Sequence, residues 1–422
     1  MNKLGKKEPR MDTDEHGCDF LEKLLDGAEV EWKPLGEVAD IYGGLTGKSK
    51  KDFEDGNAKY ISYKNIFENI HIDFNDFSQV RVSENENQHD VRYGDVLFTG
   101  SSETAIEAGM SSAVTRGFQE EVYLNSFSFG VRFNKSITLI PEFSKYLFRS
   151  SFMRREIAKT ASGVTRFNIS KARFRKLLIP IPCPENPEKS LAIQAEIVRI
   201  LDTFTELTAE LTAELTARKK QFNYYRDQLL TFEEGEVEWK TLGEVFQMRA
   251  GQHISASKIM DNAGDGHIYP CFGGNGIRGY VQEKSHEGEY LLIGRQGALC
   301  GNVHRMKGQF YATEHAVVVV PNREINIDWA FHVLTLMNLN KYKSQSAQPG
   351  LAVGKLQGLE IPVPSLTKQA RIVAILDKFD TLTHSISEGL PREIDLRQKQ
   401  YEYYRDLLLN FPKSEPQTEI VA

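Results

Sequence analysis

Basic side chains gather in one segment of a chain that is acidic as a whole. The 52 Lys and Arg residues against 58 Asp and Glu residues give a net charge of −6. Between Lys145 and Lys176, however, ten basic residues accompany a single acidic residue, Glu156, which gives +9 over 32 residues. Ammonium and guanidinium groups neutralise phosphates, so this segment predicts contact with nucleic acid. The alternative interpretation is a solvated helix face without a ligand.

A turn inside this segment and a second basic cluster supply the candidate DNA-binding residues of the first half of the chain. Gly163, Thr165, Arg166 and Asn168 form the turn, from which side chains would reach base edges. A Gly-rich loop carries the second cluster. The candidates are Lys48, Lys50, Lys51, Arg154, Arg155, Arg166, Asn168, Lys171 and Arg173.

The second half of the chain offers residue types that are suited to reading bases. Arg pairs favourably with guanine, and Asn or Gln with adenine, in the major groove. The candidates there are His253, Lys258, Asn275, Arg278, Arg295, Gln296, Lys343, Gln348 and Lys355.

Other motifs in the chain resemble catalytic or cofactor sites but lack residues or spacings that such sites require. Gly44–Ser49 resembles a phosphate-binding loop, but Tyr42 stands where the first glycine is required and no apolar helix follows. Phe272–Gly276 is better interpreted as a tight turn. The histidines and the cysteines (Cys18, Cys183, Cys271, Cys300) lack metal-ligand spacing, and no Asn/Asp-Pro-Pro-Tyr/Phe motif of adenine methyltransferases occurs. We therefore expect no catalytic residue, no metal ligand and no cofactor bound by this chain.

The elements that position these residues are organised by an internal repeat. Val30–Val38 recurs as Val237–Val245 with eight of nine positions identical. Ile179–Pro182 recurs as Ile361–Pro364, Gln194–Phe204 as Gln369–Phe379, and Tyr224–Asp227 as Tyr403–Asp406. Between these anchors the two halves match faintly, for example Gly94–Gly100 with Gly288–Gly294. Two variable segments of one fold thus alternate with two constant segments.

The constant segments predict long helices. Apolar residues recur every three or four positions from about Ser190 to Leu230, and again after Ile372, with an expected break at Gly389 and Pro391. The first helix contains a tandem tetrapeptide, Thr208, Ala209, Glu210, Leu211 and then Thr212, Ala213, Glu214, Leu215. A helix of this length with a narrow apolar stripe needs a helical partner. Near the helix ends, Tyr224, Tyr225, Arg226, Tyr403, Tyr404 and Arg405 predict packing or contact with another subunit.

The variable segments predict α+β domains. Short β-rich runs (Lys59–Tyr63, Asp95–Thr99, Tyr290–Ile293, Ala316–Val320) stand among turns, and helices follow near Glu142–Ala161 and Trp329–Leu339. The longest apolar run has about five residues, which is too short to span a membrane.

This arrangement resembles the specificity subunit of type I restriction-modification systems, in particular the branch that has the Thr-Ala-Glu-Leu repeat. The resemblance covers nearly the whole chain. It implies an α+β fold with two similar target recognition domains and two long helices forming an antiparallel coiled coil, in a pseudo-two-fold arrangement. On this basis we expect an N-terminal segment (1–26), recognition domain 1 (27–178), a central helical region (179–234), recognition domain 2 (235–360), a distal helical region (361–411) and a tail (412–422).

The resemblance also implies a function without catalysis. Each recognition domain would read one half of a bipartite, asymmetric DNA target, and the tandem repeat would set the spacing between the halves. Two methyltransferase subunits and two restriction–translocase subunits would act on the bound DNA in the cytoplasm, and S-adenosylmethionine, ATP and Mg²⁺ would belong to those partners. Two alternatives remain open at this point, a structural coiled-coil adaptor and a solitary DNA methyltransferase.

Overall fold

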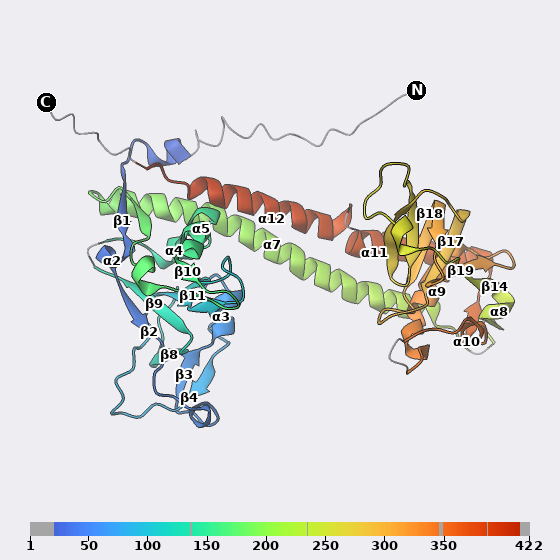
Figure 1. The fold of residues 1–422 in the computed structure, drawn as a ribbon, viewed down its shortest axis with the longest axis horizontal. Coiled ribbons are helices and arrows are strands. Elements are labelled where there is room, and N and C mark those ends of the chain that lie inside the picture. The colour runs from blue at the N-terminus through green and yellow to red at the C-terminus, as the bar shows by residue number, and fades with distance from the viewer. Residues whose placement is uncertain (1–20, 136, 234, 346–348, 386, 414–422) are drawn as a thin grey trace. The chain divides into compact units, whose positions relative to one another are not determined.

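The computed structural model describes residues 21–135, 137–233, 235–345, 349–385 and 387–413. The chain divides into two compact units, each of which is described by itself below. The first unit runs to Ala209 and resumes at Leu396, and the second runs from Glu210 to Asp395. Both units combine sheets and helices, as the sequence predicted (Figure 1).

The first unit contains strands that form several small sheets rather than one large one. Its strands are β1 (Val30–Pro34), β2 (Ala39–Gly43), β3 (Ala58–Ile61), β4 (Ser78–Val80), β5 (Val96–Thr99), β6 (Ser101–Ser102), β7 (Ser111–Ala113), β8 (Val122–Leu124), β9 (Ser128–Phe133), β10 (Ala161–Ser162), β11 (Phe167–Ile169) and β12 (Leu178–Pro182). Its helices are α2 (Leu35–Val38), η1 (Lys50–Phe53), α3 (Tyr63–Glu68), α4 (Pro141–Leu147), α5 (Ser151–Thr160) and α6 (Lys171–Phe174). The sheets have the strand orders β2-β9-β5-β7, β4-β3-β8, β10-β11-β6 and β1-β12.

An aromatic cluster forms the centre of the first unit. The rings of Phe98 and Phe129 stack at 5.4 Å between centroids, and Phe174 contacts both edge-on at 5.0 Å. The cluster joins the central strands β5 and β9 to α6, which starts from the capping hydroxyl of Ser170. The core thereby fixes the end of the basic segment to the sheet.

The second unit contains one larger sheet. Its strands are β13 (Glu238–Thr241), β14 (Phe246–Ala250), β15 (Tyr269–Gly273), β16 (Gly276–Val281), β17 (His286–Gly294), β18 (Val303–Ala312), β19 (Ala316–Pro321) and β20 (Glu360–Val363). Its shorter helices are α8 (Leu242–Val245), η2 (Ala256–Lys258), α9 (Ile327–Leu336), η3 (Leu339–Tyr342) and α10 (Val353–Gln357). The six-stranded sheet has the order β14-β19-β17-β18-β15-β16, and β13 pairs with β20.

The repeated sequences occupy corresponding places in the two units. Each Val-Glu-Trp-Lys strand, β1 or β13, pairs antiparallel with the Ile-Pro-x-Pro strand, β12 or β20. A one-turn helix and a strand follow, and the order β2-β9-β5 corresponds to β14-β19-β17. The faint match between Gly94–Gly100 and Gly288–Gly294 therefore falls on equivalent central strands, β5 and β17. The two variable segments share a scaffold.

The constant segments form three helices: α7 (Pro187–Leu230), α11 (Leu366–His384) and α12 (Gly389–Leu408). The break between α11 and α12 precedes Gly389, so Pro391 stands in the first turn of α12, where its missing N–H is tolerated. In the first unit Ile193, Ile197 and Leu201 of α7 enter the domain core with Leu408. In the second unit Phe222 of α7 contacts His384 and Tyr225 stacks on Phe379, with centroids 5.5 and 5.6 Å apart. Residue numbers rise along α7 as they fall along α11, so these two helices are antiparallel.

No helix within the described ranges is both long enough and apolar enough to cross a lipid bilayer.

Candidate nucleic-acid interface

The basic segment of the first unit divides into inward-facing and exposed side chains. The exposed residues are Arg155, Lys159, Arg166, Lys171, Arg173, Arg175 and Lys176. Lys145, Arg149 and Arg154 are mostly or wholly covered and bind groups of the fold. The net charge of the segment therefore overstates the charge that is available to a ligand.

Arg149 and Arg154 hold loops of the first unit through backbone carbonyl groups. Arg149 donates to the carbonyl oxygens of Ser111 at 2.7 Å and Ile66 at 3.0 Å, among others. Arg154 donates to the carbonyls of Ile106 and Ala108, both at 2.7 Å, and of Gly109. Burial lowers the pKa of each guanidinium to about 10. This placement corrects the prediction for Arg154, whose donors are engaged by the protein.

Arg166 lies at the tip of a hairpin made by β10 and β11. The turn at 163–166 requires glycine at its first position, because a Cβ on Gly163 would lie 1.9 Å from the carbonyl oxygen of Arg166. Strand β11 also pairs with β6, and Arg166 Nε donates to Ser101 Oγ at 3.0 Å. Arg166 thus projects from a hairpin whose strand β11 is paired with β10 on one side and with β6 on the other.

A pocket of about 580 Å³ opens beside Arg166. Two stacked rings, Tyr63 and Phe67 with centroids 5.8 Å apart, form part of its lining. The carboxylates of Glu103 and Glu107 also line it. The pocket therefore combines an aromatic wall with donors and acceptors, which are the groups that contact nucleobases.

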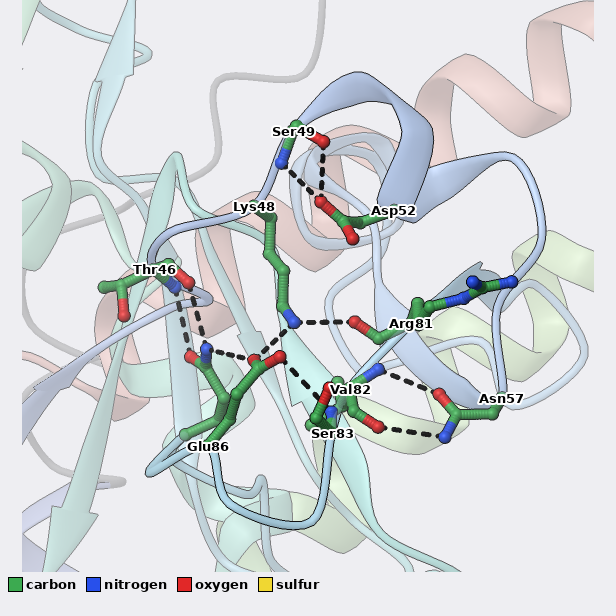
Figure 2. A network of polar contacts seen from close by, with 10 residues as sticks. Thr46, Lys48, Ser49, Asp52, Asn57, Arg81, Val82, Ser83 and Glu86 are labelled. Carbon is green, nitrogen blue, oxygen red and sulfur yellow. Dashed lines mark hydrogen bonds and ion pairs between the residues drawn. The ribbon is translucent and has the colours of Figure 1, made fainter.

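The loop with the second basic cluster is held by a polar network (Figure 2). Lys48 Nζ donates to the carbonyl oxygen of Arg81 at 2.6 Å and to the Glu86 carboxylate. The hydrogen bond from Lys48 lowers the pKa of Glu86 to about 2. Because the Lys48 side chain is only 4% exposed, its ammonium joins two loops and is not presented to a ligand. Lys50 and Lys51 remain exposed on η1.

In the second unit, two of the predicted residues meet at Glu314. His253 Nδ1 lies 3.0 Å from Glu314 Oε1, and Arg295 Nη1 donates to the Glu314 carbonyl oxygen at 3.4 Å. Nearby, the turn containing Asn275 packs on the end of β17, since a Cβ on Gly294 would lie 1.9 Å from the Gly274 carbonyl oxygen. Asn275 Oδ1 accepts from Asn302 Nδ2 at 2.9 Å. The predicted tight turn at Phe272–Gly276 is confirmed as the connection between β15 and β16.

The other predicted residues of the second unit are distributed more widely. Lys258 shares a pocket of about 480 Å³ with His253, and Arg278 and Gln296 are exposed. Lys343 donates to Asn340 Oδ1 at 3.0 Å, and the Lys355 ammonium lies 6.0 Å from the Tyr342 ring centroid. Gln348 lies outside the described residues.

Two polar residues that were not predicted from the sequence dock each unit on its helix. In the first unit Gln194 Oε1 accepts from the backbone N–H of Ile140 at 2.9 Å, and Asp202 Oδ1 accepts from Tyr146 Oη at 2.5 Å. Lys145 Nζ also donates to Asp202 Oδ1, at 2.6 Å. These bonds fix both ends of α4 to α7.

The second unit repeats the same contacts at equivalent positions. Gln369 Oε1 accepts from the backbone N–H of Asn326 at 2.9 Å, and His332 Nε2 lies 2.9 Å from Asp377 Oδ1. Arg305 Nη2 donates to Asp377 Oδ1 at 2.8 Å, in the role of Lys145. The acceptors are identical polar residues in the repeated segment Gln194–Phe204 and Gln369–Phe379, and this identity was the signal available in the sequence.

The tandem tetrapeptide lies within α7 as predicted. Leu207, Leu211 and Leu215 are half-buried, while Ala209 and Glu210 are exposed, so one stripe packs and the rest faces water. The division of the chain between the two units falls between Ala209 and Glu210.

Three of the four tyrosines near the helix ends are exposed. Tyr224 is 62% exposed, Tyr225 39% and Tyr404 38%. Arg405 is instead engaged in the first unit, where Nη2 donates to Ser151 Oγ at 3.1 Å, and Arg226 pairs with its neighbour Asp227 at 2.8 Å. Tyr403 is half-buried. The predicted contact of these residues with another subunit stays a prediction.

Comparison with known proteins identifies the repeated architecture. The sequence model of the type I restriction modification DNA specificity domain matches residues 28–218 and 234–396. The type I restriction enzyme EcoprrI specificity subunit of Escherichia coli is 52% identical, with 87% of this chain and 92% of that protein covered. The EcoR124I/EcoR124II specificity subunit of Escherichia coli is 38% identical, with 94% and 98% covered.

A solved structure, titled as the structural basis of assembly and conformational transition of the type I R-M system, contains a chain with the same fold. Its TM-score is 0.62 at 17% identity, covering 90% of this chain and 97% of that one. The S subunit of a type I restriction-modification system from M. genitalium gives a TM-score of 0.53 at 16% identity, covering 92% and 98%. This chain belongs to the family of type I restriction-modification DNA specificity subunits.

Proposed function

We propose that this chain is the non-catalytic subunit that selects the DNA sequence on which a type I restriction-modification complex acts. Each unit reads one half of a bipartite, asymmetric target. Residues 27–178 and 235–360 are the two recognition domains. The resulting position of the complex on DNA directs adenine methylation and ATP-dependent cleavage by the partner subunits.

One observation carries this proposal beyond family membership. The two units keep the same order of three strands, β2-β9-β5 and β14-β19-β17, and the same docking contacts on their helices, yet the residues that follow the central strand differ. After β5 the first unit has Ser101, which accepts from Arg166 Nε, and Ser102, whereas after β17 the second unit has Arg295 and Gln296. A shared scaffold that carries different side chains at this place suits two recognition surfaces for two different half-sites.

The chemistry belongs to the partners in this proposal. Two methyltransferase subunits bring S-adenosylmethionine, and two restriction–translocase subunits bring the ATP and Mg²⁺ sites, all in the cytoplasm. The exposed Tyr224, Tyr225 and Tyr404 are the residues that we assign to contact with these subunits. The helix α7, with the tandem repeat, sets the spacing between the half-sites.

Phosphate contacts fall to the exposed basic residues of the first unit. Lys171 and Arg175 on and after α6, and Lys50 and Lys51 on η1, are exposed residues. Such contacts hold the complex on DNA without specifying sequence, and they make the affinity depend on salt.

Co-expression with the cognate methyltransferase, followed by genome-wide mapping of methylated adenines, tests the proposal. We expect one bipartite motif with an unspecified spacer. The isolated chain incubated with S-adenosylmethionine and the same DNA should transfer no methyl group. Methylation by the isolated chain would favour the solitary methyltransferase, and a complex that binds DNA without sequence preference would favour the coiled-coil adaptor.

A further inference from the structure

The pocket beside Arg166 has a feature that a phosphate site lacks, namely carboxylates next to the arginine. We infer that Arg166 reads a guanine in the half-site of the first unit, with the edge of that base pair entering the pocket. This inference rests on the proposed function and names the residue that carries part of its specificity.

Arg166 is held so that its outer nitrogens are available. Its Nε is engaged by Ser101 Oγ at 3.0 Å, and the Gly163 turn fixes the backbone from which it projects. Within the described residues, no protein group accepts a hydrogen bond from either terminal nitrogen of Arg166, and the residue is exposed. Two parallel N–H donors on an anchored guanidinium match O6 and N7 of guanine in the major groove.

The surroundings favour a base edge over a phosphate. Glu103 and Glu107 line the same pocket as Arg166, and their negative charges would repel a phosphate group. A carboxylate can instead accept from the N4 amino group of the cytosine that is paired with the guanine. Val164, which is 90% exposed on the hairpin, adds an apolar group that is suited to a groove.

In the second unit, a different residue stands where Ser101 faces the Arg166 hairpin in the first. There Gln296 pairs with Gly350 in an isolated β-bridge, as Ser101 pairs with Asn168 between β6 and β11. The segment after the central strand is thus bound to the segment before the short helix α6 or α10 in both units. The pairing that supports the Arg166 hairpin is thus retained in the second unit, while the side chains on it differ.

The test uses the complex of the full chain with its methyltransferase partner and compares four variants. Arg166→Ala removes the guanidinium, and Arg166→Lys keeps the positive charge but loses the two parallel N–H donors. Ser101→Ala removes the acceptor of the Nε hydrogen bond and leaves the guanidinium in place. Arg92→Ala is the matched control, because Arg92 is an exposed arginine of the same unit whose Nε is 2.7 Å from Asp90.

Methylation mapping gives the first readout. With Arg166→Ala and Arg166→Lys, one guanine of the first half-site should become unspecified, with discrimination falling about 5- to 150-fold. Ser101→Ala should relax the same position less. The second half-site and the Arg92→Ala map should be unchanged. If Arg166→Ala lowered methylation equally on all sequences and Arg166→Lys restored it, Arg166 would be assigned to a phosphate contact. That result would overturn the inference.

Binding to DNA with 7-deazaguanine gives the second readout, because this base lacks the N7 acceptor. Substitution at the guanine concerned should weaken binding by the wild-type complex and cause no further loss for Arg166→Ala. Additive losses would overturn the inference, as would a first half-site without guanine on either strand. If the wild-type complex methylates no defined motif, the proposed function fails; if it does so and Arg166→Ala changes nothing, only this inference fails.

Discussion

The docking of α4 on α7 predicts an unusually costly substitution at Asp202. Asp202→Ala leaves the Tyr146 hydroxyl and the Lys145 ammonium without the acceptor that lies 2.5 and 2.6 Å away. The Tyr146 residue is 1% exposed and the Lys145 side chain 10% exposed, so water replaces the carboxylate poorly. Each unsatisfied buried donor costs about 1–3 kcal/mol. Since the Asp202 side chain is itself 33% exposed and partly screened, we expect about 2–3 kcal/mol in total.

Hydrogen exchange measured by mass spectrometry resolves this effect by unit. A loss of about 2–3 kcal/mol corresponds to about 30- to 150-fold faster exchange in peptides covering α4, while peptides covering α9 should keep their rates. Glu196→Ala is the control on the same helix, because Glu196 only forms an exposed pair with Arg199 at 2.6 Å. We expect that variant to cost less than about 1 kcal/mol. Equal protection of α4 in the two variants would refute the reasoning, and so would equal loss of protection in both units after Asp202→Ala.

Three further predictions concern the helices and the modular units. Burial lowers the pKa of His332, which lies beside Asp377 and Arg305, so the folded unit favours the neutral imidazole. The stability of the unit is therefore fully present above the unfolded pKa of about 6.5, and part of it is lost as the pH falls through the lower folded pKa. His332→Tyr should remove this pH-dependent loss, measured as the unfolding of peptides that cover α9. A third Thr-Ala-Glu-Leu copy after Leu215 should lengthen α7 by about 6 Å and rotate its leucine stripe by about 40° beyond one full turn. Methylation mapping should then show one more unspecified base pair between two unchanged half-sites. Exchanging residues of about 40–178 for the segment of a relative should change one half-site only, and a map altered in both halves would contradict modular recognition.

Helix periodicity made the long helix predictable. The expected helix from about Ser190 to Leu230 is observed as Pro187–Leu230, because a stripe sustained over many turns constrains both its ends and its face. The central strands were also predictable, since Asp95–Thr99 and Ala316–Val320 are apolar runs between turns. The observed strands are Val96–Thr99 and Ala316–Pro321.

Whether an individual basic side chain binds the fold or remains exposed was not predictable in the same way. Lys48 and Arg154 look in sequence like Lys50 and Arg155, yet the first pair binds groups of the fold and the second pair is exposed. The difference arises from loops distant in sequence, such as the carbonyl of Arg81 and that of Ile106, which provide acceptors to Lys48 and Arg154. Charge patterning finds a basic surface but does not say which of its members the fold itself requires.

The docking contacts explain how a recognition domain can change its sequence and remain attached to a constant helix. Gln194 and Gln369 each accept from a backbone N–H, of Ile140 and of Asn326, and a backbone donor is present whatever side chain stands there. Each aspartate has two partners from the domain, Tyr146 and Lys145 on Asp202 and His332 and Arg305 on Asp377. The constant helix therefore demands from the variable segment a helix start, one hydroxyl or imidazole and one basic side chain. Variation at the hairpin tip around Arg166 lies outside these demands, so the residues that we propose to read DNA can diverge without altering how either unit is held.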